Sequence, residues 1–260
     1  MKFEELNLNS DLKASIQKLG FTDCTDIQEA AFDPIVSGKD VAGLSQTGSG
    51  KTAAFLIPLI ERIYRSREEN STRGFKDWKS NSFILVLVPT RELAEQVLKN
   101  LDHLTTDEKI RAVSVYGGVS YDKQKSLIAE GVEFVIATPG RLIDLHKEHV
   151  INLSNVKAIV FDEADRMFDM GFKDDMRYIL QRIPLERQYL VFSATLNFDV
   201  LNVAYEFGSN PLELNISREN TKAEQVNDHI LHVGQEDKPK FLLSILKKTN
   251  PEQVIVFSNF

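Results

Sequence analysis

Residues 45–52, with the sequence SQTGSGKT, have the composition of a phosphate-binding loop. They follow the apolar stretch DVAGL and precede AAFLIPLIERIY, which has helical periodicity. Glycines let backbone N–H groups converge on phosphate oxygens, and the helix N-terminus adds partial positive charge. The strict pattern has glycine where this chain has Ser45, but Gly-Lys-Thr between a strand and a helix still predicts nucleotide binding. The candidate nucleotide-binding residues in this loop are Thr47, Gly48, Ser49, Gly50, Lys51, which can reach the terminal phosphates, and Thr52, whose hydroxyl can ligate Mg²⁺.

A second candidate group, Asp162-Glu163-Ala164-Asp165, follows the apolar stretch VKAIVF. A carboxylate at the end of a buried strand can hold Mg²⁺ through water, so Asp162 is a candidate metal ligand together with Thr52. Glu163 can orient and deprotonate a water molecule that attacks a γ-phosphate. Acidic residues also complement the dipole at helix N-termini, but that alternative does not explain this pair beside a phosphate loop. The candidate catalytic residues are therefore Lys51, Asp162 and Glu163.

The elements that must position these residues are six short apolar or β-branched stretches. They are residues 41–44, 83–88, 112–116, 134–137, 158–161 and 189–192, and a polar turn and a helical pattern follow them. Apolar strands that alternate with helices predict an α/β fold with a mostly parallel sheet and helices on both faces. Ligands bind at the carboxyl ends of the strands in such sheets, where both candidate groups fall.

The overall composition excludes several classes of protein. The 260 residues include 31 Lys+Arg and 38 Asp+Glu, a net charge of −7 that argues against nucleic-acid binding through a basic surface. Cys24 is the only cysteine, which excludes an internal disulfide and a cysteine-ligated zinc cage. The first residues lack the apolar core of a signal peptide, and the apolar run 83–88 is too short to span a bilayer. We therefore expect a cytoplasmic protein.

Two segments depart from the alternation of strands and helices. Residues 66–82 are polar and carry the only tryptophan, Trp78, and their length predicts a mobile surface insertion. Residues 209–225 have the composition of a linker that would follow a first domain of residues 1–208. Residues 226–260 have the pattern of one β-α-β unit, with strands at 226–233 and 254–260 and a helix through 241–246. Such a unit cannot bury both faces of its sheet. We expect this segment to be the truncated beginning of a second domain and to be disordered, self-associated or proteolysed.

In the order and spacing of these motifs, residues 3–260 resemble the DEAD-box ATP-dependent RNA helicases. Asp-Glu-Ala-Asp at residues 162–165 gives this family its name. The family core consists of two tandem RecA-like domains that clamp ATP and single-stranded RNA between them. The resemblance therefore implies a complete first RecA-like domain, the start of the second, ATP and Mg²⁺ as cofactors and RNA as the partner.

The segment GFTDCTDIQ, residues 20–28, resembles the adenine-recognition motif of the family. By this resemblance Phe21 stacks on adenine and Gln28 reads its hydrogen-bonding edge, which implies ATP in place of GTP. The alternative for Gln28 is an exposed amide on a helix. Cys24 and Asp26 stand where the family usually has proline, so we expect a more flexible loop and weaker nucleotide binding.

Residues 89–94 and 138–141 each follow a strand and open a helix. Threonine is a natural N-cap in both, and Pro139 suits the first helical position, so each segment offers an anion site without lysine. Ordinary capped helices have the same pattern, but the resemblance implies contacts to the RNA backbone, which carry no base information. The implied RNA-binding residues are Pro89, Thr90, Arg91, Gly117, Gly118, Thr138, Gly140 and Arg141. By resemblance alone, the segment 193–195 contacts the DEAD segment, and Asp165, Ser193 and Thr195 couple hydrolysis to the separation of RNA strands.

The resemblance also implies what these residues would do on their own. The second domain of the family contributes a His-Arg-x-Gly-Arg-x-x-Arg segment, and an arginine that stabilises the transferring phosphoryl group is worth about 10³–10⁵ in rate. The sequence contains no such segment. We expect the chain to bind ATP or ADP with Mg²⁺, to hydrolyse ATP barely if at all, and not to unwind RNA. Alternatives are a DNA helicase or remodelling ATPase, and a nucleotide-dependent nucleic-acid-binding module without unwinding activity, whereas a signalling GTPase would need an Asn-Lys-x-Asp motif.

Overall fold

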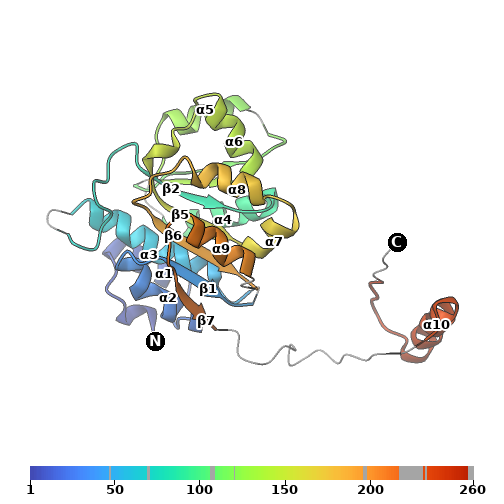
Figure 1. Ribbon diagram of the computed structural model, residues 1–260. Coiled ribbons are helices and arrows are strands. Elements are labelled where there is room, and N and C mark those ends of the chain that lie inside the picture. Colours follow the sequence, from blue (N-terminus) through green and yellow to red (C-terminus); the bar gives the residue numbers. More distant parts are fainter. Residues whose placement is uncertain are drawn as a thin grey trace. The chain divides into compact units, whose positions relative to one another are not determined.

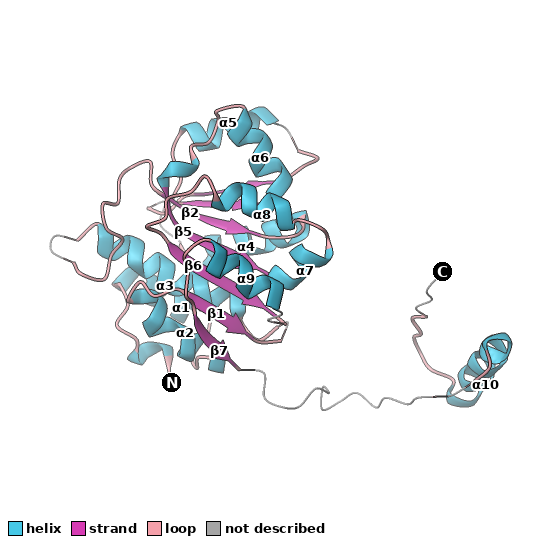
Figure 2. Cartoon of the chain, viewed as in Figure 1, coloured by secondary structure: helices cyan, strands magenta, loops and turns pink. Residues whose placement is uncertain are grey.

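The computed structural model describes residues 1–46, 48–68, 71–105, 109–119, 121–195, 198–216, 231 and 233–256. The chain divides into two compact units, Met1–Arg218 and Glu219–Phe260 (Figure 1). Helices surround a central sheet in the first unit (Figure 2), and each unit is described by itself below.

The sheet of the first unit has seven strands in the order β3-β4-β2-β5-β6-β1-β7, and all neighbouring strands are parallel. The prediction of a parallel α/β sheet is therefore confirmed. Six strands match the predicted apolar stretches within two residues at either end, and the seventh, β7, was not predicted. The strands are β1 (Val41–Leu44), β2 (Phe83–Leu87), β3 (Ala112–Val115), β4 (Phe134–Ala137), β5 (Val156–Asp162), β6 (Gln188–Ser193) and β7 (Leu212–Asn215).

Helices cover both faces of the sheet because successive strand residues point to opposite sides. On β2, Ile84 and Val86 belong to one hydrophobic core, whereas Leu85 and Leu87 belong to the other. The first core is completed by α1 (Ser10–Lys18), α2 (Asp26–Val36), α3 (Lys51–Ser66) and α4 (Arg91–Leu104). The second is completed by α5 (Tyr121–Ala129), α6 (Pro139–Lys147), α7 (Ala164–Asp169), α8 (Lys173–Leu180) and α9 (Phe198–Glu206). Short 3₁₀ helices lie at η1 (Phe3–Glu5) and η2 (Leu153–Asn155).

The segment 66–82 was predicted to be a mobile surface insertion, and the structure contradicts this for residues 73–78. The Arg62 guanidinium donates hydrogen bonds to the carbonyls of Arg73 and Gly74 and lies 3.9 Å from the centroid of the Phe75 ring. Phe75 is buried, and Trp78 packs against the same core with its ring centroid 5.3 Å from that of Phe75. One buried arginine and one buried phenylalanine thus fix a segment whose composition is polar.

The first unit also extends beyond residue 208, where the sequence predicted that a linker begins. Strand β7 pairs with β1 and lies inside the predicted linker. Ser209 donates its hydroxyl to Asp40 Oδ2 at 2.6 Å, and the Leu212 N–H donates to the Asp40 carbonyl at 2.8 Å. Strand β7 is an exposed edge strand and not a buried one. Its sequence LELN therefore lacks the continuous apolar run by which the buried strands were predicted.

The second unit contains the 3₁₀ helix η3 (Gln235–Asp237) and α10 (Lys238–Thr249), which includes the helix predicted at 241–246. Apolar side chains of α10, such as Phe241 and Leu243, are exposed. Residues 254–256 form no strand, although the sequence predicted one, and most of the other predicted strand lies outside the described residues. None of the helices in the described ranges combines the length and the apolar composition that a bilayer crossing requires.

Candidate functional site

The phosphate-binding loop connects β1 to α3, and its glycines adopt left-handed backbone conformations. Gly48 has a φ of +82° and Gly50, the N-cap of α3, has a φ of +89°. The left-handed backbone at Gly50 favours glycine, and a Cβ atom there would lie 2.5 Å from Gln28 Nε2, so the Gln28 amide would have to move. Ser45, which departs from the strict pattern, is buried and its hydroxyl lies 2.7 Å from that of Ser49. Thr47 lies outside the described residues.

Lys51 opens α3 and is buried in the loop. Its ammonium donates hydrogen bonds to the carbonyls of Ser45 at 2.6 Å and Gln46 at 3.1 Å. Burial lowers the pKa of Lys51, while the carboxylates of Asp162 and Glu163 oppose this shift. The loop thus holds a partly desolvated cation whose partners are neutral carbonyls, which an anionic ligand can replace.

The candidate acids follow β5 at the same edge of the sheet. Asp162, the last residue of β5, is buried, and burial raises the pKa of its carboxyl to about 7 although Lys51 favours the carboxylate. Glu163 has a φ of +54°, a conformation that is strained for any residue except glycine. Its carboxylate accepts a hydrogen bond from Arg166 at 3.2 Å. This arginine was not predicted from the sequence, although a spacing of three residues on a helix is a known signal for an ion pair.

The residues beside the loop suit Mg²⁺ better than a metal that needs a cage of protein ligands. Within the described ranges, no group of three or more His, Cys, Asp or Glu side chains could hold a metal ion. Mg²⁺ usually keeps several waters and is held by one or two protein oxygens together with substrate phosphates. The Thr52 hydroxyl and the Asp162 carboxylate, which line one pocket, are such a donor pair.

Gln28 joins the phosphate loop to the segment that resembles the adenine motif. Its Oε1 accepts from the Thr25 N–H at 2.9 Å, and its Nε2 donates to the Gly50 carbonyl at 3.2 Å. The side chain is buried, so the alternative of an exposed amide on a helix is wrong. An amide keeps one further donor and one further acceptor site when two are in use.

Phe21 lies beside Gln28 with an exposed ring that stacks on the buried ring of Phe3, with centroids 6.1 Å apart. The loop that carries it is held by N-terminal residues. The Phe3 N–H donates to the Thr22 carbonyl at 3.0 Å, and the Cys24 N–H donates to the Met1 carbonyl at 2.9 Å. A proline at position 24 would have a fixed φ but no N–H. Cys24, in place of the family's proline, can therefore donate this hydrogen bond but leaves φ free.

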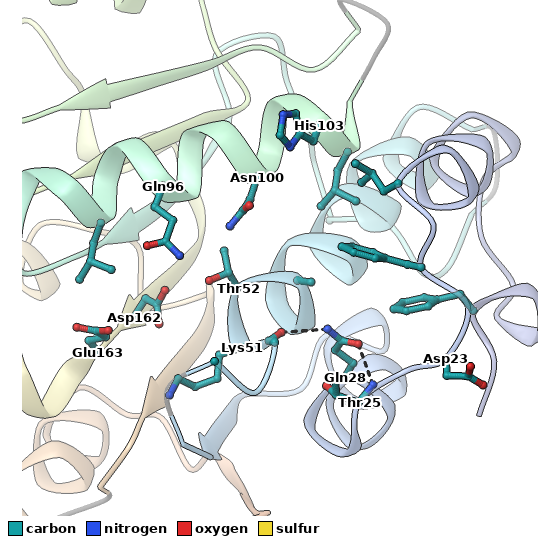
Figure 3. A pocket seen from close by; sticks show the side chains of 18 residues that line it. Asp23, Thr25, Gln28, Lys51, Thr52, Gln96, Asn100, His103, Asp162 and Glu163 are labelled. Atoms are coloured by element: carbon teal, nitrogen blue, oxygen red, sulfur yellow. Dashed lines mark hydrogen bonds between the residues drawn. The ribbon is translucent and has the colours of Figure 1, made fainter. Parts of the chain in front are cut away.

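A pocket of about 460 Å³ contains both ends of this arrangement. Lys51, Thr52, Asp162 and Glu163 lie toward one end and Gln28 toward the other (Figure 3), and Phe21 also lines the pocket. Helix α4 forms a further wall through Gln96, Asn100 and His103, which the sequence analysis did not identify. Their spacing of four and three residues places them on one helical face, but only the folded structure shows that this face borders the pocket.

Two predicted helix caps lie at the ends of β2 and β4. The Thr90 hydroxyl accepts from the Leu93 N–H at 3.3 Å, which confirms it as the cap of α4. Thr138 precedes α6 and Pro139 occupies the first turn as predicted, but the Thr138 side chain forms no capping hydrogen bond. The prediction of a side-chain cap is therefore wrong for Thr138, and the first N–H groups of α6 are correspondingly freer to bind an anion.

Among the remaining candidate RNA-binding residues, Arg91 and Arg141 reach the turn after β3 that carries Gly117 and Gly118. The Arg91 guanidinium carbon lies 5.6 Å from the centroid of the Tyr116 ring, and its Nη1 lies 3.7 Å from the place of a Cβ at Gly118. Arg141 donates to the Val119 carbonyl at 3.1 Å and to Gln124 Oε1 at 3.2 Å. The backbone is open at Gly117 and Gly140, where a Cβ would meet no atom within 4 Å, whereas Pro89 is buried.

The structure also brings together the three residues that the resemblance assigned to coupling. Asp165 Oδ2 accepts from the N–H and from the hydroxyl of Thr195, both at 3.0 Å, and the Asp165 N–H donates to the Ser193 hydroxyl at 3.1 Å. Burial raises the pKa of Asp165, but the hydrogen bonds from Ser193 and Thr195 outweigh it and leave the pKa below its usual value. The acidic segment is thus tied to the end of β6.

Comparisons with known proteins agree with this geometry. The profile of the DEAD/DEAH box helicase family matches residues 25–203. The ATP-dependent RNA helicase RhlB of Shewanella oneidensis is 37% identical over 99% of this chain and 58% of its own length. RhlB of Xanthomonas campestris pv. campestris is 42% identical over the whole of this chain and 45% of its own length.

Among solved structures, a hypothetical ATP-dependent RNA helicase from Sulfolobus tokodaii is 33% identical and superimposes with a TM-score of 0.69. The match covers 80% of this chain and 57% of that one. The chain thus spans less than two thirds of the length of these relatives. The profile match covers most of the first unit and includes the phosphate loop, the acidic segment and the turns around them. The chain belongs to the DEAD/DEAH box helicase family.

Proposed function

We propose that this chain is the nucleotide-binding part of an ATP-dependent RNA helicase and acts in the cytoplasm. The observation that carries the proposal is the single pocket that Lys51 and Asp162 line together with Gln28 and Phe21. A nucleoside triphosphate needs this combination of a phosphate-binding end and a base-binding end. The names of the RhlB relatives, which are ATP-dependent RNA helicases, support the same activity.

The chemistry follows from the side chains that surround the phosphates. Lys51 would exchange its bonds to the carbonyls of Ser45 and Gln46 for the terminal phosphates. Thr52 and Asp162 would hold Mg²⁺, which when bound neutralises charge on the β- and γ-phosphate oxygens. Glu163, held by Arg166, would orient the attacking water and accept its proton.

We propose that RNA lies along the neighbouring part of the same sheet edge. Arg91, Arg141, Gly118 and the open backbone at Gly117 and Gly140 would contact phosphates and sugars. Such contacts carry no base information, so binding would be independent of sequence. The hydrogen bonds that join Asp165 to Ser193 and Thr195 would transmit the state of the nucleotide to this edge.

We also propose that the two units belong to different domains of the family core. The first unit would be the first RecA-like domain, and the second unit would begin the other domain of the family core. The 260 residues contain no His-Arg-x-Gly-Arg-x-x-Arg segment. These residues by themselves would therefore bind ATP or ADP with Mg²⁺, hydrolyse ATP slowly and not separate RNA strands.

Isothermal titration of the chain with ADP and GDP in the presence of Mg²⁺ tests the nucleotide site. We expect the wild-type chain to bind ADP at least tenfold more tightly than GDP, because Gln28 and Phe21 contact the base. Lys51→Ala should lose most of the affinity for both nucleotides, while Lys99→Ala, an exposed lysine on α4, should retain it. Equal affinity of Lys51→Ala and wild type for ADP would refute the proposal.

A further inference from the structure

Helix α4 presents a polar face to the nucleotide pocket that none of the assigned roles uses. Ala94, Val97 and Leu101 of this helix are buried in the core, whereas Gln96, Asn100 and His103 line the pocket. Within the part of the chain that the structure describes, the side chains of Gln96 and Asn100 form no hydrogen bond. Ligand pockets fix the orientation of their ligand through a small number of such polar groups on a largely apolar wall.

The order of these residues along α4 matches the order of the parts of a nucleotide. Figure 3 shows Gln96 nearest to Asp162 and Glu163, Asn100 above Thr52, and His103 farthest from the two acids. The phosphates belong at the acidic end and the base belongs near Gln28. The sugar, which joins phosphates to base, must therefore pass through the middle of the pocket, where Asn100 lies.

The chemistry of an asparagine amide suits a sugar better than a phosphate. It has two N–H donors and a carbonyl acceptor but no charge, so it can pair with hydroxyls that both donate and accept. Asn100 is also half-buried, and a hydrogen bond in such a place competes less with water than one on the surface.

We propose that Asn100 is a specificity-determining residue that hydrogen-bonds the ribose hydroxyls of the bound nucleotide, so that α4 forms a third wall of the site. This inference rests on the proposed nucleotide site. A site that is built to hydrogen-bond a hydroxyl binds the analogue without that hydroxyl more weakly, because its polar group is left unpaired. The chain should therefore prefer ribonucleotides to sugars that lack the 2′- and 3′-hydroxyls.

The test measures the dissociation constants of ADP and 2′,3′-dideoxy-ADP, both with Mg²⁺, by titration calorimetry. We expect wild type to bind ADP about five- to tenfold more tightly than the dideoxy analogue, as one or two hydrogen bonds imply. Asn100→Ala should lower the affinity for ADP to that for the dideoxy analogue and leave the affinity for the analogue unchanged. Lys99→Ala, the exposed neighbour on the same helix, should behave as wild type.

A second variant separates loss of the contact from loss of the fold. Asn100→Leu keeps the number of side-chain heavy atoms and the branch at Cγ, and it favours the helix, so it should fold and give the same pattern as Asn100→Ala. Wild-type affinity of both variants for ADP, or an equal loss for ADP and the dideoxy analogue, would overturn the sugar contact alone. Failure of wild type to bind either nucleotide would instead refute the proposed nucleotide site and this inference with it.

Discussion

The two halves of one sheet edge differ in how their polar groups are held. On the side of β1 and β5, Lys51, Asp162 and Gln28 are buried, and the pKa values of the lysine and the aspartate are displaced. On the side of β2, β3 and β4, Arg91 is exposed and Arg141 is held by a backbone carbonyl and an amide. The first side is built for a ligand that enters a pocket, and the second for one that lies across a surface.

This difference explains how an acidic protein could bind RNA. The net charge of −7 argues against a broad basic surface, and only a few cations need to face the ligand when turns and helix N-termini also contribute N–H donors. Affinity for RNA should then be modest and depend on salt, whereas affinity for the nucleotide should depend on shape and on protonation. Each prediction below changes one side of the edge and uses the other as its control.

The largest effect should come from glycines with left-handed backbone on the two sides. Gly50→Ala forces a Cβ to within 2.5 Å of Gln28 Nε2 and breaks the amide's bond to the loop. We expect the free energy of unfolding to fall by about 2–3 kcal/mol, and ADP binding to be lost. Gly118→Ala on the RNA side, with φ +89° but only an ordinary contact, should cost about 1–2 kcal/mol through its backbone alone. If denaturant titrations gave the same loss in free energy of unfolding for Gly50→Ala and Gly118→Ala, the contact between the new Cβ and Gln28 would not contribute.

The next effect concerns pH. Burial raises the pKa of Asp162 to about 7, so the free protein carries mostly the protonated acid at pH 6 and mostly the carboxylate at pH 8. A metal ligand must be deprotonated, and affinity for Mg-ADP should therefore rise about tenfold between these pH values. Asp162→Asn should bind weakly with no such rise, whereas RNA binding by wild type should be unaffected by this titration. Calorimetry at several pH values that gave a flat profile for wild type would contradict the assignment.

A smaller effect is expected from removing one threonine hydroxyl on each side of this edge. Thr195→Val removes one hydrogen bond to Asp165 and should lower the free energy of unfolding by about 1 kcal/mol at pH 7. The native pKa of Asp165 is below its usual value, so its contribution is present above pH 4 and is lost as the pH falls further. The deficit of Thr195→Val should shrink accordingly. Thr90→Val, which removes a helix cap on the RNA side, should cost a similar amount without this pH dependence.

The smallest effect belongs to the exposed arginine. Arg91→Ala should weaken binding of single-stranded RNA about threefold for any sequence and reduce the salt dependence by the equivalent of about one phosphate contact. Its affinity for Mg-ADP should match wild type. Fluorescence anisotropy with two unrelated RNA sequences at several salt concentrations measures both quantities, and a loss confined to one sequence would contradict a backbone contact.

The sequence predicted the parts of this edge whose signals are local. A glycine-rich loop, an acidic pair after an apolar stretch and six strands have patterns that span a few residues each. Strand β7 and the burial of Phe75 were missed because they depend on partners outside the local pattern, Asp40 and Arg62. The wall formed by Gln96 and Asn100 was missed for the same reason, since periodicity shows which residues share a face but not what that face borders.

The most direct test of the account is a crystal structure of the chain with Mg²⁺ and ADP. We expect the phosphates on the N–H groups of residues 45–52, the metal near Thr52 and Asp162, the base against Phe21 and Gln28, and the sugar within hydrogen-bonding distance of Asn100. A nucleotide bound elsewhere, or a base that makes no contact with Gln28 or Phe21, would contradict the central claim that this pocket is an adenine-nucleotide site.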